Sequence, residues 1–166
     1  MNYSKALNEC IESAYMVAGH FGARYLESWH LLIAMSNHSY SVAGATLNDY
    51  PYEMDRLEEV ALELTETDYS QDETFTELPF SHRLQVLFDE AEYVASVVHA
   101  KVLGTEHVLY AILHDGNALA TRILERAGFS YEDKKDQVKI AALRRNLEER
   151  AGWTREDLKA LRQRHR

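Results

Sequence analysis

Apolar residues recur at intervals of three and four in two long stretches of the chain, the spacing of a helix with one buried face. The first stretch runs from Leu7 to Phe21 and the second from Leu84 to Val98. Each predicts an amphipathic helix of about 17 residues. Ser4 and Ser81 stand three residues before the first leucine of each stretch. A helix N-cap is expected there, because a serine oxygen can accept a backbone N–H of the first turn.

These two stretches belong to a longer repeat with an offset of 77 residues. Without any gap, twelve identical residues align over about fifty positions, which indicates tandem duplication of a helical unit. The identical pairs are Ser4/Ser81, Leu7/Leu84, Ala14/Ala91, Val17/Val94, Ala18/Ala95, Ala23/Ala100, Leu26/Leu103, His30/His107, Leu32/Leu109, Ala34/Ala111, Ala43/Ala120 and Leu47/Leu124.

A shared motif predicts the second helix of each copy. It is "LESWHLLIAMS" in the first copy and "LGTEHVLYAIL" in the second. We expect Ser28 and Thr105 to be the N-caps of these helices. His30 and His107 are expected to be structural, packed and hydrogen-bonded so that they fix the helix start.

Two further helices are expected in each copy, near 40–47 and 53–64 and near 117–127 and 131–143. The predicted fold class is therefore all-α, a tandem pseudo-symmetric repeat of two four-helix units with about eight helices. The expected parts are unit 1 at 3–64, an acidic connector at 65–79, unit 2 at 80–145, and a basic helical tail or linker at 146–166. Within this tail, Thr154 and Asp157 match a capping box.

Charge is unevenly distributed along the chain. The net charge is −9, yet residues from Lys139 onward carry nine basic and four acidic side chains, which leaves −14 on residues 1–138. An acidic body repels nucleic acid, so no nucleic-acid partner is expected. A single cysteine, no signal peptide and no apolar run of about 20 residues favour a soluble cytoplasmic protein that binds no membrane.

Motifs for catalysis or metal binding are weak. The segment Glu27–His30 fits the Glu-x-x-His pattern of di-iron bundles, but Gly104 replaces the acid in the second copy. Cys10 lies on a buried stripe, and the chain has neither a Gly-x-Ser-x-Gly elbow nor a Gly-Lys phosphate loop. No catalytic residue, metal or bound cofactor is therefore expected in these residues.

Trp29 occupies the helix-start position at which the second copy carries Glu106. Because its counterpart is charged, we expect Trp29 to be partly exposed. It then either anchors a binding partner or packs across the groove between the units, and the sequence leaves both interpretations open.

The doubled four-helix pattern with "GTEHVLYAIL" closely resembles the N-terminal Clp repeat domain of the Clp AAA+ unfoldases, and most closely the ClpC type of Gram-positive bacteria. The resemblance covers roughly residues 3–145. It implies a noncatalytic recognition domain that docks adaptor proteins of the MecA type and substrate polypeptides for a ClpP-type peptidase. ATP and Mg are implied only for a full-length relative with its ATPase, and the isolated domain is expected to be a monomer.

The resemblance also implies recognition of phosphoarginine, whose guanidinium the acidic residue of the motif helps to hold. Glu106 matches that residue in the second unit, beside Thr105, whereas Trp29 stands there in the first. We expect the phosphate to rest on the helix start at Ser81, provided that Ser81 lies close to Glu106, and its counterpart Ser4 is a further candidate. A stand-alone helical scaffold and a metal-binding helical enzyme are the alternatives.

Overall fold

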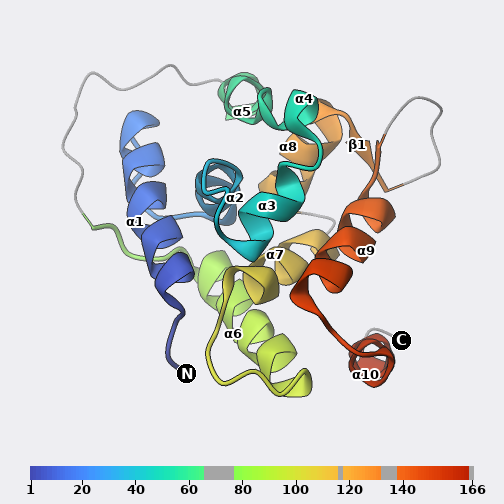
Figure 1. Ribbon diagram of the computed structural model, residues 1–166. Coiled ribbons are helices and arrows are strands. Elements are labelled where there is room, and N and C mark those ends of the chain that lie inside the picture. The colour runs from blue at the N-terminus through green and yellow to red at the C-terminus, as the bar shows by residue number, and fades with distance from the viewer. Residues whose placement is uncertain (66–76, 116–117, 132–137, 165–166) are drawn as a thin grey trace.

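The computed structural model describes residues 1–65, 77–115, 118–131 and 138–164. Its helices surround one continuous hydrophobic core to which both repeat units contribute (Figure 1). This confirms the predicted all-α class. The helices are α1 (Lys5–His20), α2 (Ser28–Ser36), α3 (Val42–Leu47), α4 (Pro51–Met54), α5 (Leu57–Thr65), α6 (His82–Val97), α7 (Thr105–His114), α8 (Leu119–Ala127), α9 (Ile140–Ala151) and α10 (Arg155–Arg164).

The first helix of each unit, α1 or α6, begins as the sequence predicts. Ser4 Oγ accepts a hydrogen bond of 3.1 Å from the Leu7 amide, and Ser81 Oγ accepts one of the same length from the Leu84 amide. Both serines therefore satisfy an N–H group for which the first helical turn has no acceptor of its own.

The second helices, α2 and α7, begin one residue earlier than predicted, so Ser28 and Thr105 are not their N-caps. The N-caps are Glu27 and Gly104, and a histidine of the first turn takes over the capping interaction. The amide of Glu27 donates to Nδ1 of His30 over 2.9 Å, and the amide of Gly104 donates to Nδ1 of His107 over 2.8 Å. The histidines thus fix the helix starts, and the hydroxyl groups are not needed for capping.

The two units are connected crosswise: the backbone before the first helix of each unit pairs with the backbone before the second helix of the other unit. The Ser4 amide donates to the Leu103 carbonyl over 2.8 Å, and the Ser81 amide donates to the Leu26 carbonyl over 3.0 Å. The start of α1 therefore lies beside the start of α7, and the start of α6 lies beside the start of α2. These two parallel bridges correspond to each other under the 77-residue offset.

The third helices are exchanged between the units. Helix α3 of the first unit packs against α7 and α9, while α8 of the second unit packs against α2 and α5 (Figure 1). One buried hydrogen bond crosses this contact, from the Ala43 amide at the start of α3 to Oγ1 of Thr105, over 3.2 Å. The units consequently form one interleaved body.

The fourth helices depart from the predicted pattern. The segment expected as one helix at 53–64 is divided into α4 and α5. In the second unit, a short parallel pair of strands, β1 (Phe129–Ser130) and β2 (Val138–Lys139), precedes α9. Residues 132–137 of the helix expected near 131–143 lie outside the described part. Helix α9 continues to Ala151, beyond the expected boundary at 145.

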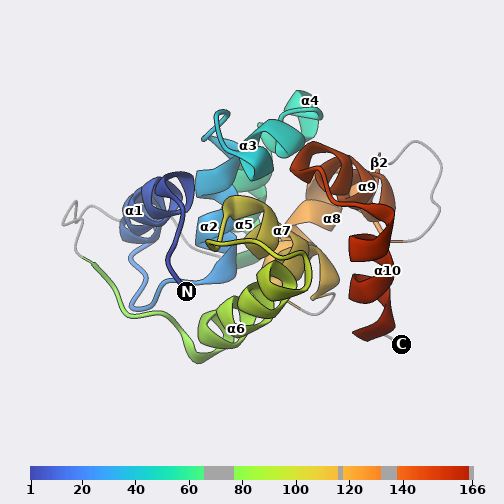
Figure 2. The same ribbon diagram turned by 60° about the horizontal axis from the view of Figure 1, so that its bottom comes forward.

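The C-terminal residues fold back onto the domain. Thr154 and Asp157 form the predicted capping box at the start of α10, with reciprocal hydrogen bonds of 2.9 and 3.1 Å. Helix α10 follows α9 at the edge of the domain (Figure 2), contacts α6, and buries Leu161, which is 1% exposed. Trp153 stacks on His107 with ring centroids 6.1 Å apart. The helix predicted in the tail therefore contributes to the core. Most of the expected connector, residues 66–76, lies outside the described residues.

Candidate binding sites at the paired helix starts

The crosswise connection places Glu106 beside Ser4, and this corrects the expectation that Glu106 and Ser81 share a site. Glu106 follows Leu103, whose carbonyl accepts the Ser4 amide. We call the region formed by the starts of α1 and α7 the first helix-start site. It combines two helix N-termini, where free N–H groups and the helix dipoles favour an anion, with one carboxylate that favours a cation.

The Glu106 carboxylate is held against the start of its own helix. Its side chain is 19% exposed and folds over Gly104, leaving no room for a Cβ atom at that position. Burial raises the pKa of Glu106, while a hydrogen bond from its own backbone amide opposes the rise. Glu106 is thus a largely buried carboxylate that keeps a small part of its surface open to solvent.

Glu106 Oε1 also lies 3.4 Å from Nδ1 of His107, but this pair is not an ion pair. Burial lowers the pKa of His107 to about 4, and its Nδ1 accepts the Gly104 amide. The imidazole is therefore neutral near pH 7 and leaves the negative charge of Glu106 uncompensated.

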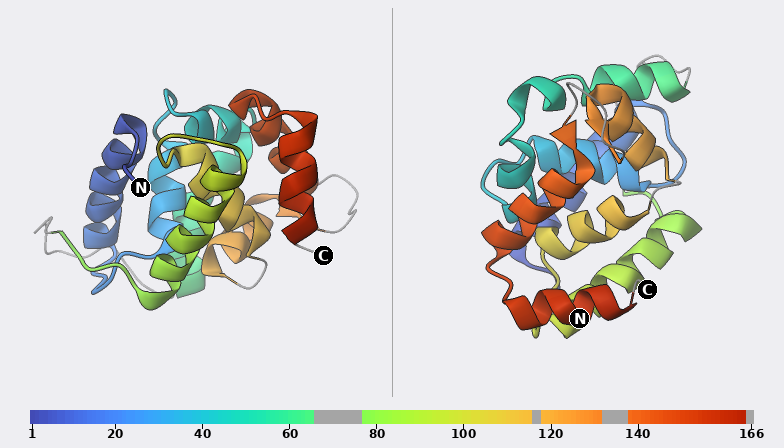
Figure 3. Two further views of the ribbon diagram at one scale, coloured as in Figure 1. Left: turned by 90° about the horizontal axis from the view of Figure 1, so that it is seen from below. Right: turned by 90° about the vertical axis from the view of Figure 1, so that its right-hand side faces the viewer.

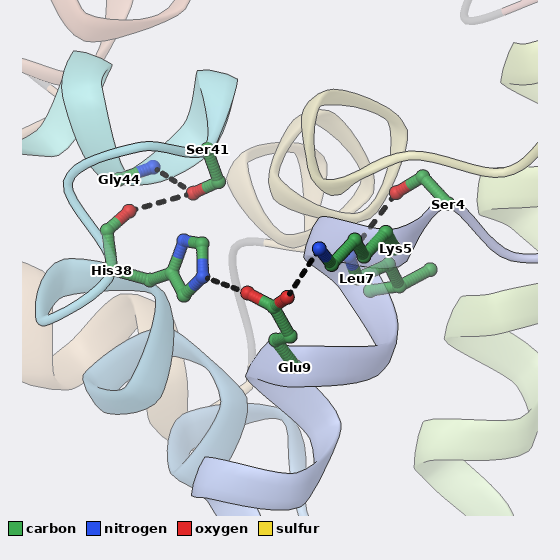
Figure 4. A network of polar contacts seen from close by, with 7 residues as sticks. All are labelled: Ser4, Lys5, Leu7, Glu9, His38, Ser41 and Gly44. Atoms are coloured by element: carbon green, nitrogen blue, oxygen red, sulfur yellow. Dashed lines mark hydrogen bonds and ion pairs between the residues drawn. The ribbon is translucent and has the colours of Figure 1, made fainter.

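A polar network continues from this site along α1 (Figure 4). Lys5, almost fully exposed, lies 4.0 Å from Glu9 Oε1, and Glu9 Oε2 lies 2.7 Å from Nε2 of His38. His38 in turn accepts the Ser41 hydroxyl on its carbonyl oxygen, and Ser41 caps α3. Lys5 is the cationic side chain closest in sequence to Ser4, and a pair this exposed leaves it able to contact a ligand.

The second helix-start site, at the starts of α6 and α2, differs from the first. Trp29 takes the place of the acid, and its exposed fraction is 7%, so the prediction that it is partly exposed is wrong. Its ring packs edge-on against Phe21 at 4.7 Å and lies 4.0 Å from the ring of His30. The indole is thus directed onto the end of α1, and it cannot serve as an exposed contact anchor.

His30, behind Trp29, is completely buried. Its Nδ1 accepts the Glu27 amide, so its proton resides on Nε2, for which the described residues provide no acceptor. Burial lowers the pKa of His30 to about 3. Its Nδ1 is engaged by the Glu27 amide, and within the described residues no group of three or more His, Cys, Asp or Glu side chains could hold a metal ion.

An open groove of about 780 Å³ lies between α1 and the segment that precedes α6. Two acids, Glu12 and Glu77, line it together with aromatic and aliphatic side chains. The aromatic and aliphatic side chains are Tyr3, Ile11, Tyr15, Leu78, Pro79 and Phe80. Tyr3 and Phe80 both contact Phe88 of α6, with ring centroids 5.7 and 5.0 Å apart. Each directly precedes a cap serine, so the groove adjoins both helix-start sites.

The repeat pattern did not predict this groove, although the sequence carries one signal for it. Tyr3 and Phe80 align under the 77-residue offset, and both are aromatic without belonging to a helical stripe. Tyr25, Tyr40 and Tyr52, which also lie off the apolar stripes, are exposed on the surface. None of the helices in the described ranges has both the length and the hydrophobicity needed to cross a bilayer.

Two interleaved helical units with paired starts define a double-repeat helical domain. The family model described as the Clp repeat (R) N-terminal domain matches residues 2–127, and the chain belongs to this family. The family defines a noncatalytic N-terminal domain of Clp chaperones, and the chain carries no phosphate-loop motif.

Solved structures share the fold. The N-terminal domain of the chaperone ClpD from Arabidopsis thaliana has 17% identity and a TM-score of 0.68, with 91% of this chain and 95% of that chain covered. The Hsp104 N-terminal domain from Candida albicans has 17% identity and a TM-score of 0.69, with 95% and 96% covered. A protein from a malarial secretion system has 20% identity and a TM-score of 0.64, with 90% and 97% covered. No curated protein sequence matches.

Proposed function

We propose that this domain recognises polypeptides for a cytoplasmic AAA+ unfoldase of the ClpC type. In this proposal it is monomeric, and it receives substrates directly or through an adaptor of the MecA type. The ATPase, which uses ATP and Mg, then unfolds the bound chains and passes them to a ClpP-type peptidase. Holding a substrate near the unfoldase raises its effective concentration without requiring a tight contact.

The observation that carries the proposal is the groove with its aromatic floor and acidic rim, next to the first helix-start site. Tyr3 and Phe80 offer rigid apolar surface, and Glu12 and Glu77 favour basic residues in the bound segment. An extended segment rich in apolar and basic side chains fits this lining better than an acidic one.

The first helix-start site suits a phosphoarginine side chain presented by such a segment. The guanidinium would pair with Glu106, whose charge His107 leaves uncompensated. The phosphate would bind the N-terminus of α1 and the ammonium group of Lys5. The second helix-start site lacks the acid, because Trp29 replaces it and is buried. One phosphoarginine per domain is therefore proposed.

The test is an NMR titration of the 166-residue protein with phosphoarginine and, separately, with an unfolded basic polypeptide. Glu106→Gln should weaken phosphoarginine binding at least tenfold, the effect of losing about 1.4 kcal/mol from a charge-assisted interaction. Glu125→Gln, at an exposed position on α8, is the matched control and should change nothing. Equal affinities for wild type and Glu106→Gln would remove phosphoarginine from the proposal.

The polypeptide arm separates the two parts of the proposal. Phe80→Ala should weaken binding of the unfolded polypeptide and leave phosphoarginine affinity within about twofold of wild type, since the groove and the carboxylate are different contacts. If the polypeptide shifts no resonance of Tyr3, Tyr15 or Phe80, the groove is not the recognition surface.

A further inference from the structure

A second hollow lies between α7, α9 and α10, away from the groove and from both helix-start sites. Its volume is about 350 Å³. Helix α10 follows α9 after a short connection, and Figure 3 shows it at the edge of the domain. Three of the seven side chains that line the hollow are arginines and only one is acidic, although the protein has a net charge of −9.

Three arginines from two helices converge on this hollow. Arg144 and Arg145 come from α9, and Arg162 comes from α10. Arg144 Nη1 lies 3.4 Å from Nε2 of His114. Because Nδ1 of His114 lies 2.9 Å from the Tyr110 carbonyl, it carries the proton, so Nε2 is an acceptor that orients the guanidinium.

The charges in the hollow do not balance. Glu148 is the one acid that lines it, and it is 7% exposed. Burial raises the pKa of Glu148, although the three arginines oppose the rise. Among the described residues, no ion pair within 4.0 Å joins Arg144, Arg145 or Arg162 to a carboxylate.

Two arginines outside the hollow have carboxylate partners. On the same helix α9, Arg150 donates from Nη2 to both carboxylate oxygens of Asp49, over 2.9 and 3.0 Å. Arg126 lies 3.8 Å from Glu63. Arg150 and Arg126 thus each face a carboxylate, whereas three guanidinium groups gather around a hollow lined by a single carboxylate.

We propose that this hollow binds a small polyvalent oxyanion of the phosphate class, of the size of pyrophosphate. Guanidinium groups present planar pairs of N–H donors that match phosphate oxygens, and several of them around one cavity favour a multiply charged anion. The volume admits such an anion between α9 and α10, where it would tie α10 to the rest of the domain.

The test is calorimetric titration of the protein with inorganic pyrophosphate at about 0.15 M salt, where long-range attraction is screened. Binding should be measurable at millimolar concentrations or below. Arg144→Gln and Arg162→Gln should each weaken it at least tenfold. Arg122→Gln, an equal charge change at an exposed position on α8, is the control and should keep wild-type affinity.

Glu148→Gln gives an independent reading, because it removes the opposing charge without removing a donor. It should tighten pyrophosphate binding severalfold, and unchanged or weaker binding would contradict the proposal. A nucleoside triphosphate arm separates the sources of the phosphate. If the nucleoside triphosphate binds more tightly than pyrophosphate, the hollow recognises a nucleotide. Equal affinities indicate that it recognises the phosphate groups alone.

Two further outcomes would overturn the site. One is the absence of heat at millimolar pyrophosphate in a protein that is folded by circular dichroism. The other is a hexaglutamate peptide that binds as tightly as pyrophosphate, since the hollow would then respond to charge only. The site shares no residue with the groove or the helix-start sites, so neither result bears on the proposed function.

Discussion

His99 adopts a left-handed backbone conformation with φ of 60°, at the position that Gly22, with φ of 64°, occupies in the first repeat unit. Both residues follow the first helix of their unit, and the next amide closes the helix end. The Ala23 amide donates to the Ala18 carbonyl over 3.0 Å, and the Ala100 amide donates to the Ala95 carbonyl over 2.9 Å. A side chain is thus strained in one unit at a position where the other unit has glycine.

Replacing His99 with glycine should therefore stabilise the protein. The relief of left-handed strain is worth about 1 kcal/mol in the free energy of unfolding, partly offset by the greater freedom of glycine in the unfolded chain. Urea unfolding measures the change. Gly22→Ala is the matched variant and should destabilise by about the same amount. A His99→Gly protein less stable than wild type would show that the imidazole makes a contact that outweighs the strain.

Stability should fall in acid because of His30. Its folded-state pKa is about 3, below the ordinary value of 6.5, so between these pH values the unfolded chain binds a proton that the folded protein does not. The free energy of unfolding therefore rises with pH across this window. As pH falls from about 6.5 toward 3, the contribution of neutral His30 to stability is lost. Between pH 7 and pH 5, the wild type should lose about 2 kcal/mol through this residue.

The variant His30→Gln checks that prediction, because glutamine does not titrate. Its urea midpoint should change less than that of the wild type between pH 7 and pH 5, whatever its stability at pH 7. Between pH 7 and pH 8 the two proteins should show parallel behaviour. Identical acid dependence in both proteins would mean that His30 is reached by solvent in the folded state.

Thr105→Val should destabilise the contact between the repeat units. The substitution preserves shape but removes the oxygen that accepts the buried Ala43 amide, and an unsatisfied buried donor costs about 1–3 kcal/mol. Thr105→Ser retains the hydroxyl and should cost less. Chemical unfolding of the two variants gives the comparison, and a Thr105→Val cost no larger than that of Thr105→Ser would show that the hydroxyl does not stabilise the contact between the units.

Leu161→Ala should show that α10 belongs to the folded domain. Leu161 is 1% exposed, and truncation of a buried leucine costs about 2–5 kcal/mol. Leu158 on the same helix is only partly buried, so Leu158→Ala should cost less than about 2 kcal/mol. Thermal unfolding distinguishes the variants, and a Leu161→Ala cost no larger than that of Leu158→Ala would indicate that α10 detaches freely.

The helical repeat and the capping serines could be predicted because they depend on local spacing. The starts of α2 and α7 were displaced by one residue, since the imidazoles of His30 and His107 take the capping role that hydroxyl groups usually fill. Alignment with Glu106 predicted the position of Trp29 but not its direction, which depends on the partner ring of Phe21.

The crosswise connection could not be predicted from the repeat. An offset alignment preserves the order of helices within each unit, and that order is the same whether the third helix stays or is exchanged. The expectation that Ser81 lies beside Glu106 therefore assumed that helix starts of the same unit meet. The hydrogen bonds of Ser4 with Leu103 and of Ser81 with Leu26 show instead that helix starts of different units meet.

The exchange of α3 and α8 has an evolutionary consequence. A lone unit would expose the surfaces that α3 and α8 now cover, and two identical units could cover them only by trading helices as a symmetric dimer. Fusion of two such genes end to end would yield the present topology without rearranging any contact. Glu106 and Trp29, at the same position of the repeat, then leave the two helix starts unequal: the carboxylate keeps some exposure to solvent, whereas the indole is buried.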